Sequence, residues 1–262
     1  MDRCMLAQPT KELLRGDRYL YQEKADGERA IITIDKNGVK AVNRRDNDIT
    51  NNFIAELSQI KINCDSVVLD AELCADNFDK LQQRALTKNQ AKIKLLSKLI
   101  PVTIYVFDVI SVNGEDITKD TFQQRLKILS DVVQDNGMIK IMPTYEHTEL
   151  DNLLNFVKEK NGEGIMIKDR LSEYEYRRSD KWLKYKFFQE KVIRFPFYSQ
   201  NPAGIRLSDG LNAVQVAGKQ ARKVKELIDI RGYADVNVQY LVLSKNGLMR
   251  FPSFRGLANA VF

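Results

Sequence analysis

The chain has 262 residues, of which 44% are hydrophobic and 29% charged, enough for one or two folded domains. It contains no run of about 18 apolar residues, and its first residues lack the apolar core of a signal peptide, so we expect a cytoplasmic protein without a membrane partner. Three cysteines, Cys4, Cys64 and Cys74, lack metal-ligand spacing and are expected to be reduced thiols. The single histidine, His147, argues against a Ser-His-Asp triad or a multi-histidine zinc site.

The net charge of +6 is unevenly distributed. Residues 1–189 hold 30 Lys+Arg and 30 Asp+Glu, whereas residues 190–262 hold 11 and 5. A neutral body followed by a basic segment suits a polyanionic partner, although a basic solvated surface would give the same count.

Taken in chain order, the hydrophobic pattern alternates short strands with a few helices, which predicts the α+β class. The predicted strands are 19–22, 30–34, 39–42, 67–73, 102–110, 139–142, 163–168, 182–187, 191–198, 204–208, 211–217, 235–243 and 248–251. The predicted helices are 52–60, 78–100, 120–134, 149–160 and 219–230. The residues of the helix 78–100 expected in the core are Leu81, Ala85, Leu95, Leu96 and Leu99.

The change in charge near residue 189 predicts a boundary between domains 1–189 and 190–262. Several short strands with one helix in the second domain favour a small β-barrel such as an OB-fold.

Residues 23–29 read Glu-Lys-Ala-Asp-Gly-Glu-Arg and connect two predicted strands. Gly27 would let the backbone turn without a Cβ clash. A lysine that is partly desolvated beside another cation can act as a nucleophile, which makes Lys24 with Arg29 a candidate pair. An ordinary charged hairpin would fit this stretch alone equally well.

The stretch also fits the pattern K-x-D-G-x-R and resembles motif I of the covalent nucleotidyltransferases, the superfamily of DNA ligases, RNA ligases and mRNA capping enzymes. Further stretches resemble the other motifs of that superfamily in the same order: 43–45 (motif Ia), 70–72 (III), 105–108 (IIIa), 163–168 (IV) and 184–186 (V). Residues 247–254 resemble the end of the OB domain of ATP-dependent DNA ligases, and 5–7 the usual start of the catalytic core. The resemblance therefore covers nearly the whole chain and implies a nucleotidyltransferase (adenylation) domain of antiparallel sheets with flanking helices, followed by an OB-fold.

The resemblance implies that Lys24 takes up AMP from ATP as a covalent adduct. The residues implied to bind the nucleotide are Gln22, Arg29, Arg44, Glu72, Phe107, Glu163, Lys168, Lys184 and Lys186. Phe107 would stack on the base, and the cations would offset phosphate charge. Glu72 and Glu163 are oxygen donors for Mg²⁺ or Mn²⁺. Trp182 and Tyr185 are expected in the core.

The leading hypothesis is an ATP-dependent DNA ligase of minimal type, a monomer that seals nicks in double-stranded DNA. Only 23 residues precede Lys24, too few for the N-terminal domain with which NAD-dependent ligases bind nicotinamide, so ATP is the expected cofactor. They are also too few for a large N-terminal DNA-binding domain, so the second domain is expected to help hold the duplex. Its candidate DNA contacts are Arg194, Lys219, Arg222, Lys223, Lys225, Arg250 and Arg255.

Three departures from the family pattern stand out. Gln22 occupies a position that is often Glu and helps select adenine, and Ala71 replaces a glycine. No Asp-Lys pair of motif VI follows Phe254, so either Arg250 or Arg255 substitutes or the first step, adenylylation of the lysine, is slower. The alternatives are an RNA ligase, an mRNA guanylyltransferase using GTP, or a nick-binding protein that has lost catalysis.

Overall fold

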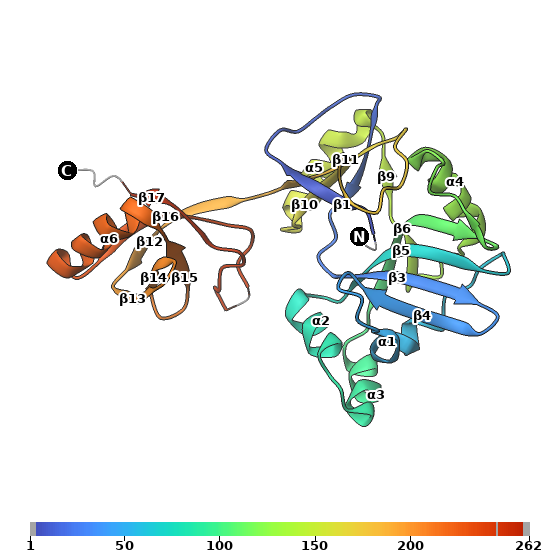
Figure 1. The fold of residues 1–262 in the computed structure, drawn as a ribbon, viewed down its shortest axis with the longest axis horizontal. Coiled ribbons are helices and arrows are strands. Elements are labelled where there is room, and N and C mark those ends of the chain that lie inside the picture. Colours follow the sequence, from blue (N-terminus) through green and yellow to red (C-terminus); the bar gives the residue numbers. More distant parts are fainter. Residues whose placement is uncertain (1–3, 245, 259–262) are drawn as a thin grey trace. The chain divides into compact units, whose positions relative to one another are not determined.

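The computed structural model describes residues 4–244 and 246–258 (Figure 1). It divides into two compact units, the first ending at Tyr185 and the second beginning at Lys186. This boundary lies four residues before the one expected from the charge distribution. In the described ranges no helix has the length and apolar character of a membrane span.

A six-stranded, largely antiparallel sheet forms one half of the first unit, in the order β4-β3-β5-β6-β7, with β8 running parallel to β6. Its strands are β3 (Glu28–Asp35), β4 (Gly38–Asn43), β5 (Val67–Cys74), β6 (Thr103–Val112), β7 (Glu115–Asp116) and β8 (Ile139–Ile141). The flanking helices are α1 (Thr50–Leu57), α2 (Phe78–Ala85), α3 (Gln90–Leu99) and α4 (Phe122–Val132). Leu69, Val106 and Phe53 are fully buried in its core, as their apolar periodicity predicts.

The second sheet of this unit has five strands in the order β1-β11-β10-β2-β9. They are β1 (Leu6–Thr10), β2 (Tyr19–Glu23), β9 (Thr144–Tyr145), β10 (Gly164–Asp169) and β11 (Arg178–Lys186). Helix α5 (Leu150–Glu159) packs against β10 and β2, after a short 3-10 turn η1 (His147–Glu149).

A separate aromatic core joins side chains from both sheets. Trp182 on β11 makes edge-to-face contacts with Phe107 on β6, Phe122 at the start of α4 and Tyr174, with ring centroids 5.8–6.1 Å apart. The expectation that Trp182 is a core residue is confirmed, since its exposed fraction is 1%. The same expectation for Tyr185 is wrong, because it is only partly buried at the end of β11. This core holds the facing strand ends of the two sheets in fixed positions.

The single helix predicted over 78–100 is wrong, because two helices occur there. The side-chain oxygens of Asn77 and Asn89 each accept a 3.0 Å hydrogen bond from the backbone N–H three residues further along the chain. They therefore cap the starts of α2 and α3. The break changes the helical phase, so Leu95 and Leu99, expected in the core, are 56% and 64% exposed.

The second unit contains two three-stranded antiparallel sheets, β12-β16-β17 and β13-β14-β15, and one helix. Its elements are β12 (Gln189–Phe195), β13 (Phe197–Asn201), β14 (Gly204–Ser208), β15 (Ala213–Val216), α6 (Gly218–Arg231), β16 (Ala234–Tyr240) and β17 (Ser253–Leu257). The strand predicted at 248–251 is instead a single bridge between Leu243 and Met249. The α+β class is confirmed, but the strands of the described part of this unit do not form a closed barrel.

Candidate active site

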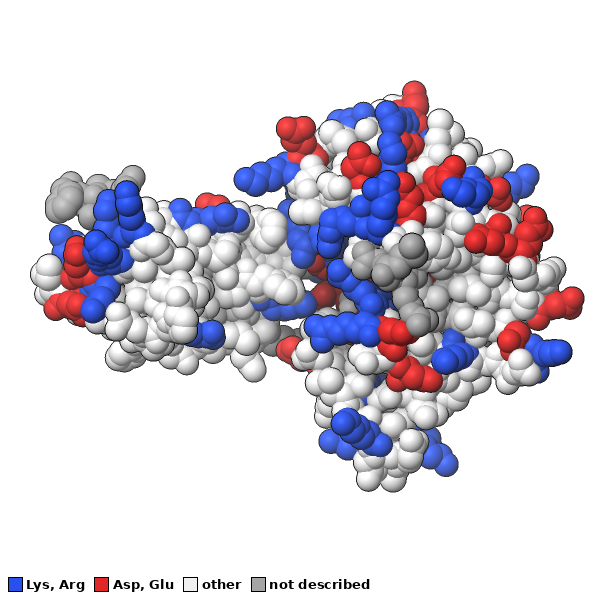
Figure 2. Space-filling model, viewed as in Figure 1, with Lys and Arg blue, Asp and Glu red and all other residues white. Residues whose placement is uncertain are grey.

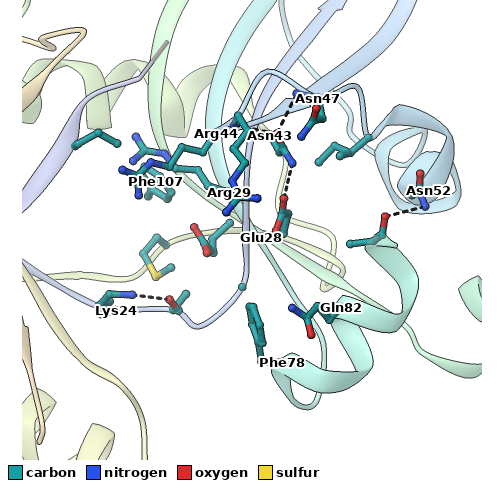
Figure 3. A pocket seen from close by; sticks show the side chains of 18 of the residues that line it. Lys24, Glu28, Arg29, Asn43, Arg44, Asn47, Asn52, Phe78, Gln82 and Phe107 are labelled. Atoms are coloured by element: carbon teal, nitrogen blue, oxygen red, sulfur yellow. Dashed lines mark hydrogen bonds between the residues drawn. The ribbon is translucent and has the colours of Figure 1, made fainter. Parts of the chain in front are cut away.

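A cavity of about 1330 Å³ opens in the first unit between the two sheets (Figure 3). Eight of the residues selected from the sequence line it: Gln22, Lys24, Arg29, Arg44, Glu72, Phe107, Lys168 and Lys184. The chain thus brings together side chains that lie up to 162 residues apart, from Gln22 to Lys184.

Lys24 lies directly after β2, where the backbone leaves the five-stranded sheet. Its amide N–H donates to the carbonyl oxygen of Gly164 at 2.9 Å, which fixes the main chain at the start of β10. The Nζ atom donates to Oε2 of Glu163 at 2.5 Å, and the Lys24 side chain is only 20% exposed. Glu163 does not itself line the cavity but holds the amine that does.

Gly27 is required for a different reason from the one the sequence indicated. Its φ is not in the left-handed region, but a Cβ atom there would lie 2.2 Å from the carbonyl oxygen of Leu73 on β5. The connection therefore needs glycine because it passes directly against the neighbouring strand.

Arg29 forms a bidentate ion pair with Asp70, with Nε 2.8 Å from Oδ1 and Nη2 bonded to Oδ2. The hydroxyl of Tyr174 donates to the same Oδ2 at 2.5 Å. Asp70 is completely buried, and Arg29 and Tyr174 donate hydrogen bonds to its carboxylate. The guanidinium also lies 5.2 Å from the Phe107 ring centroid, and the cation therefore has a fixed place in the cavity wall.

Glu72 projects from β5, directly opposite Arg29 on β3. Burial raises the pKa of its carboxyl from 4.5 to about 7, although the positive charges of Lys24 and Arg29 lower it. Glu163 contacts the amine of Lys24, and Glu72 interacts electrostatically with both Lys24 and Glu163.

Lys168 on β10 is 1% exposed, and its Nζ has no hydrogen-bond partner among the described residues. The ammonium lies 3.9 Å from the ring centroid of Trp182, 4.5 Å from that of Phe122 and 4.6 Å from that of Phe107. Burial lowers its pKa from 10.5 to about 7, against the opposing effect of Asp108 and Asp70. An unpaired cation in this position is available to an anionic ligand in the cavity.

The remaining candidates of the first unit differ in their positions. Arg44 is exposed in the turn after β4, with Arg45 beside it on the cavity rim. Lys184 on β11 is half-buried and lines the cavity. Lys186 does not line it; it begins the second unit, with its Nζ 5.1 Å from the ring centroid of Phe251.

The basic candidates of the second unit lie mostly on α6. Lys219, Arg222 and Lys223 are exposed there, and Figure 2 shows Lys and Arg side chains gathered over the region of α6 with acidic residues among them. Lys225 is half-buried, with Nζ 5.9 Å from the Tyr198 ring centroid.

The other basic candidates of this unit have partners within it. Arg194 forms a bidentate ion pair with Asp235, both contacts being 2.9 Å. Arg255 is exposed and bonds the amide oxygen of Gln239. Arg250 is half-buried near the Phe251 ring. The part of the motif VI region at 259–262 lies outside the described residues.

The sequence reasoning did not select Asp70, Tyr174, Asn43 or Thr144. Asp70 stands in the motif III stretch and is buried, and a carboxylate within an otherwise apolar run could have indicated this. Asn43 Nδ2 donates to Glu28 at 2.8 Å beside the cavity, as Figure 3 shows. Nothing in the sequence pattern indicated Tyr174 or Thr144, because their partners are distant in the chain.

Comparison with known proteins identifies the family to which the first unit is similar. Residues 4–186 match the model of the ATP dependent DNA ligase domain. The chain is 28% identical to the SPbeta prophage-derived DNA ligase-like protein LigB of Bacillus subtilis, over 95% of this chain and 96% of that protein. It is 30% identical to DNA ligase 1 of Methanosarcina acetivorans over 67% of this chain, but spans only 34% of that longer protein.

Two solved structures show the same fold. A Lig E DNA ligase, studied for DNA binding with a minimal scaffold, superposes with a TM-score of 0.72 at 20% identity, over 98% of this chain and 100% of that one. Mycobacterial DNA ligase D complexed with ATP and MES gives a TM-score of 0.56 at 19% identity, over 98% and 95% of the two chains. Because the family model covers well over half of its length, the chain belongs to the ATP-dependent DNA ligase family.

Proposed function

We propose that this protein seals nicks in double-stranded DNA, with Lys24 as the nucleophile that carries AMP. The Nζ of Lys24 attacks the α-phosphate of ATP, forming a phosphoramidate and releasing pyrophosphate. The AMP then passes to the 5′-phosphate at the nick. Finally the 3′-hydroxyl attacks that phosphate, which joins the strand and releases AMP. The observation that carries the proposal is the position of the Lys24 amine, held by Glu163 in a cavity lined by cations.

The cations would offset the negative charge that accumulates as phosphorus is attacked. Arg29 is preorganised by Asp70, so it needs no rearrangement when phosphate arrives. Lys168 has an unpaired Nζ for a phosphate oxygen, and Lys184 lies on the adjacent strand β11. Arg44 at the rim is suited to a phosphate of the incoming strand end.

Two further contributions of the first unit belong to this proposal. Phe107 would provide a flat face for the adenine base. Lys186 begins the second unit and does not line the cavity, so we expect it to contribute least among the candidates.

A divalent cation, Mg²⁺ or Mn²⁺, fits the donors that flank Lys24. Glu72 and Glu163 offer two carboxylates, and this number is typical of Mg²⁺ sites completed by substrate phosphates and water. When bound, the cation would offset the charge of the polyphosphate. The described residues hold no group of three or more acidic, His or Cys ligands, so the phosphates would complete the site.

The second unit, which we propose is an OB-fold domain, would contact the duplex through phosphates. The support is its two small sheets with one helix and the exposed cations Lys219, Arg222 and Lys223 on α6. Arg250 and Arg255 are secondary contacts, and Arg194 is the least available because Asp235 engages it. We propose that the protein acts as a monomer, since one chain supplies the whole nucleotide cavity.

The test is incubation with α-labelled ATP, or GTP in parallel, and magnesium, followed by a denaturing gel and then a nicked duplex. Label that stays on the protein only with ATP, and leaves as the nick closes, supports the proposal. Label from GTP would point to a guanylyltransferase. Sealing of nicked RNA but not DNA would point to an RNA ligase. Absence of label in protein freed of bound nucleotide would leave only nick binding.

A further inference from the structure

Gln22, on the wall of the cavity, belongs to a hydrogen-bond chain with a defined direction. Gln22 on β2 lies directly opposite Thr144 on β9 and Met166 on β10, so the three side chains share one face of the sheet. Gln22 is 1% exposed and lines the cavity together with Met142 and Met166. A buried amide beside two apolar side chains can determine ligand specificity, because its orientation decides whether it offers the ligand a donor or an acceptor.

The hydroxyl of Thr144 has only one hydrogen to donate, and it is directed at a main-chain acceptor. Oγ1 donates to the carbonyl oxygen of Met142 at 3.2 Å. Toward Gln22 the same oxygen can therefore only accept, and Nε2 of Gln22 donates to it at 2.8 Å. If the amide were rotated by 180°, its oxygen could bond Thr144 only if the hydroxyl gave up its bond to the Met142 carbonyl.

This hydrogen-bond chain fixes the direction of the Gln22 amide. Thr144 engages one N–H of Nε2, and Oε1, to which no described residue donates, is the acceptor of Gln22 that is left for a ligand. An acceptor in this place favours a base edge that carries an amino group and opposes one that carries a carbonyl oxygen.

Resting on the proposed use of ATP by this cavity, we infer that Thr144 is a positioning residue that sets the nucleotide preference. It holds the Gln22 amide with its oxygen toward the base, so that a 6-amino purine is accepted and a 6-oxo purine is rejected. Thr144 does not line the cavity and acts only through Gln22. The preference thus depends on a short edge strand rather than on the nucleotide-contacting residue alone.

The experiment compares ATP with inosine triphosphate, which carries an oxygen in place of the 6-amino group. The rate of labelled adduct formation is measured against nucleotide concentration for the wild type, Thr144→Val, Thr144→Ser and the control Thr33→Val. Thr33 is a half-buried strand threonine of β3 that does not line the cavity. The measured quantity is the ratio of kcat/KM for ATP to that for inosine triphosphate.

Thr144→Val keeps the shape of the side chain but lets the amide rotate, so we expect the ratio to fall by about tenfold or more, mainly through KM. Thr144→Ser and Thr33→Val should keep the ratio within about twofold. A general loss of packing would slow both nucleotides equally and leave the ratio unchanged.

Gln22→Glu supplies a second check, because a carboxylate presents an acceptor in either orientation. In that background Thr144→Val should no longer change the ratio. An unchanged ratio in the single Thr144→Val variant would overturn the inference while leaving the ligase proposal intact. Failure of the wild type to form an adduct with ATP would instead overturn the proposed function.

Discussion

Lys24 and Glu163, 139 residues apart in sequence, form an ion pair of 2.5 Å where the end of β2 meets the start of β10. Antiparallel pairing of these strands brings the two together, with Glu23 opposite Ile165 in the register. The amine is therefore positioned by main-chain geometry before any nucleotide binds, and the carboxylate fixes its direction.

Replacing Lys24 by alanine should abolish the covalent nucleotide adduct, because no other described amine occupies the same place against Glu163. The fold should survive, although the melting temperature should fall, because the Glu163 side chain is 6% exposed and loses this partner. Labelled adduct on a denaturing gel is the measurement, with Lys40→Ala on the exposed face of β4 as a control that keeps activity. Adduct formation by Lys24→Ala would refute the assignment of the nucleophile.

Replacing Glu163 by glutamine should slow adduct formation by about 10- to 100-fold, the range for losing one positioning contact in a reacting site. The amide is nearly the same size, so the fold should survive. Single-turnover rates with saturating ATP and magnesium would measure the effect. A rate equal to that of the wild type would mean that the ion pair has no part in placing the amine.

The buried ion pair of Arg29 with Asp70 should be sensitive to removal of either partner. Arg29→Met should lower the free energy of unfolding by about 3–5 kcal/mol, because the Asp70 carboxylate remains buried. Tyr174→Phe removes one hydrogen bond to a charged group and should cost about 1.5–3 kcal/mol. Urea denaturation measures both. Equal, small effects would show that Asp70 is rehydrated when it loses a donor.

Lys168 should make the free energy of unfolding depend on pH between about 7 and 10.5. Its pKa is about 7 in the folded protein and 10.5 in the unfolded chain, so between these values the unfolded state binds more protons. The free energy of unfolding should rise with pH across this window, by at most about 1.4 kcal/mol per pH unit.

The comparison with Lys168→Met isolates this effect. The variant should be more stable than the wild type below about pH 7, and the difference should shrink toward pH 10. Glu72 titrates in another window: its raised pKa makes stability fall as pH rises from 4.5 to about 7. A pH-independent difference between wild type and Lys168→Met would contradict the desolvated lysine.

Neutralising Lys219, Arg222 and Lys223 together by glutamine should weaken duplex binding without affecting adduct formation. Each lost phosphate contact should reduce the slope of log K against log salt by about 0.9. The matched control removes three exposed helix lysines of the first unit, Lys94, Lys98 and Lys127. Equal losses in both triple variants would mean that only net charge matters and that α6 is not a specific contact.

The sequence by itself determined the fold class, the order of the main elements and most of the candidate site. Local signals suffice for these features. Apolar residues that recur with a period of two residues indicate strands, and a period of 3.6 residues indicates helices. Short motifs identify Lys24, Glu72, Glu163 and Lys168 as candidates. Local signals misjudged residues 86–89, where two capping asparagines outweigh a continuous apolar pattern.

Only the tertiary structure decided how these residues act together. The pairing of β2 with β10 places Glu163 on Lys24, and packing of the two sheets surrounds Lys168 with three aromatic rings. Burial then shifts the pKa of Lys168 and of Glu72, an effect that depends on neighbours distant in the chain. The direction of the Gln22 amide likewise depends on Thr144, 122 residues away, because hydrogen-bond partners are fixed by strand pairing rather than by sequence proximity.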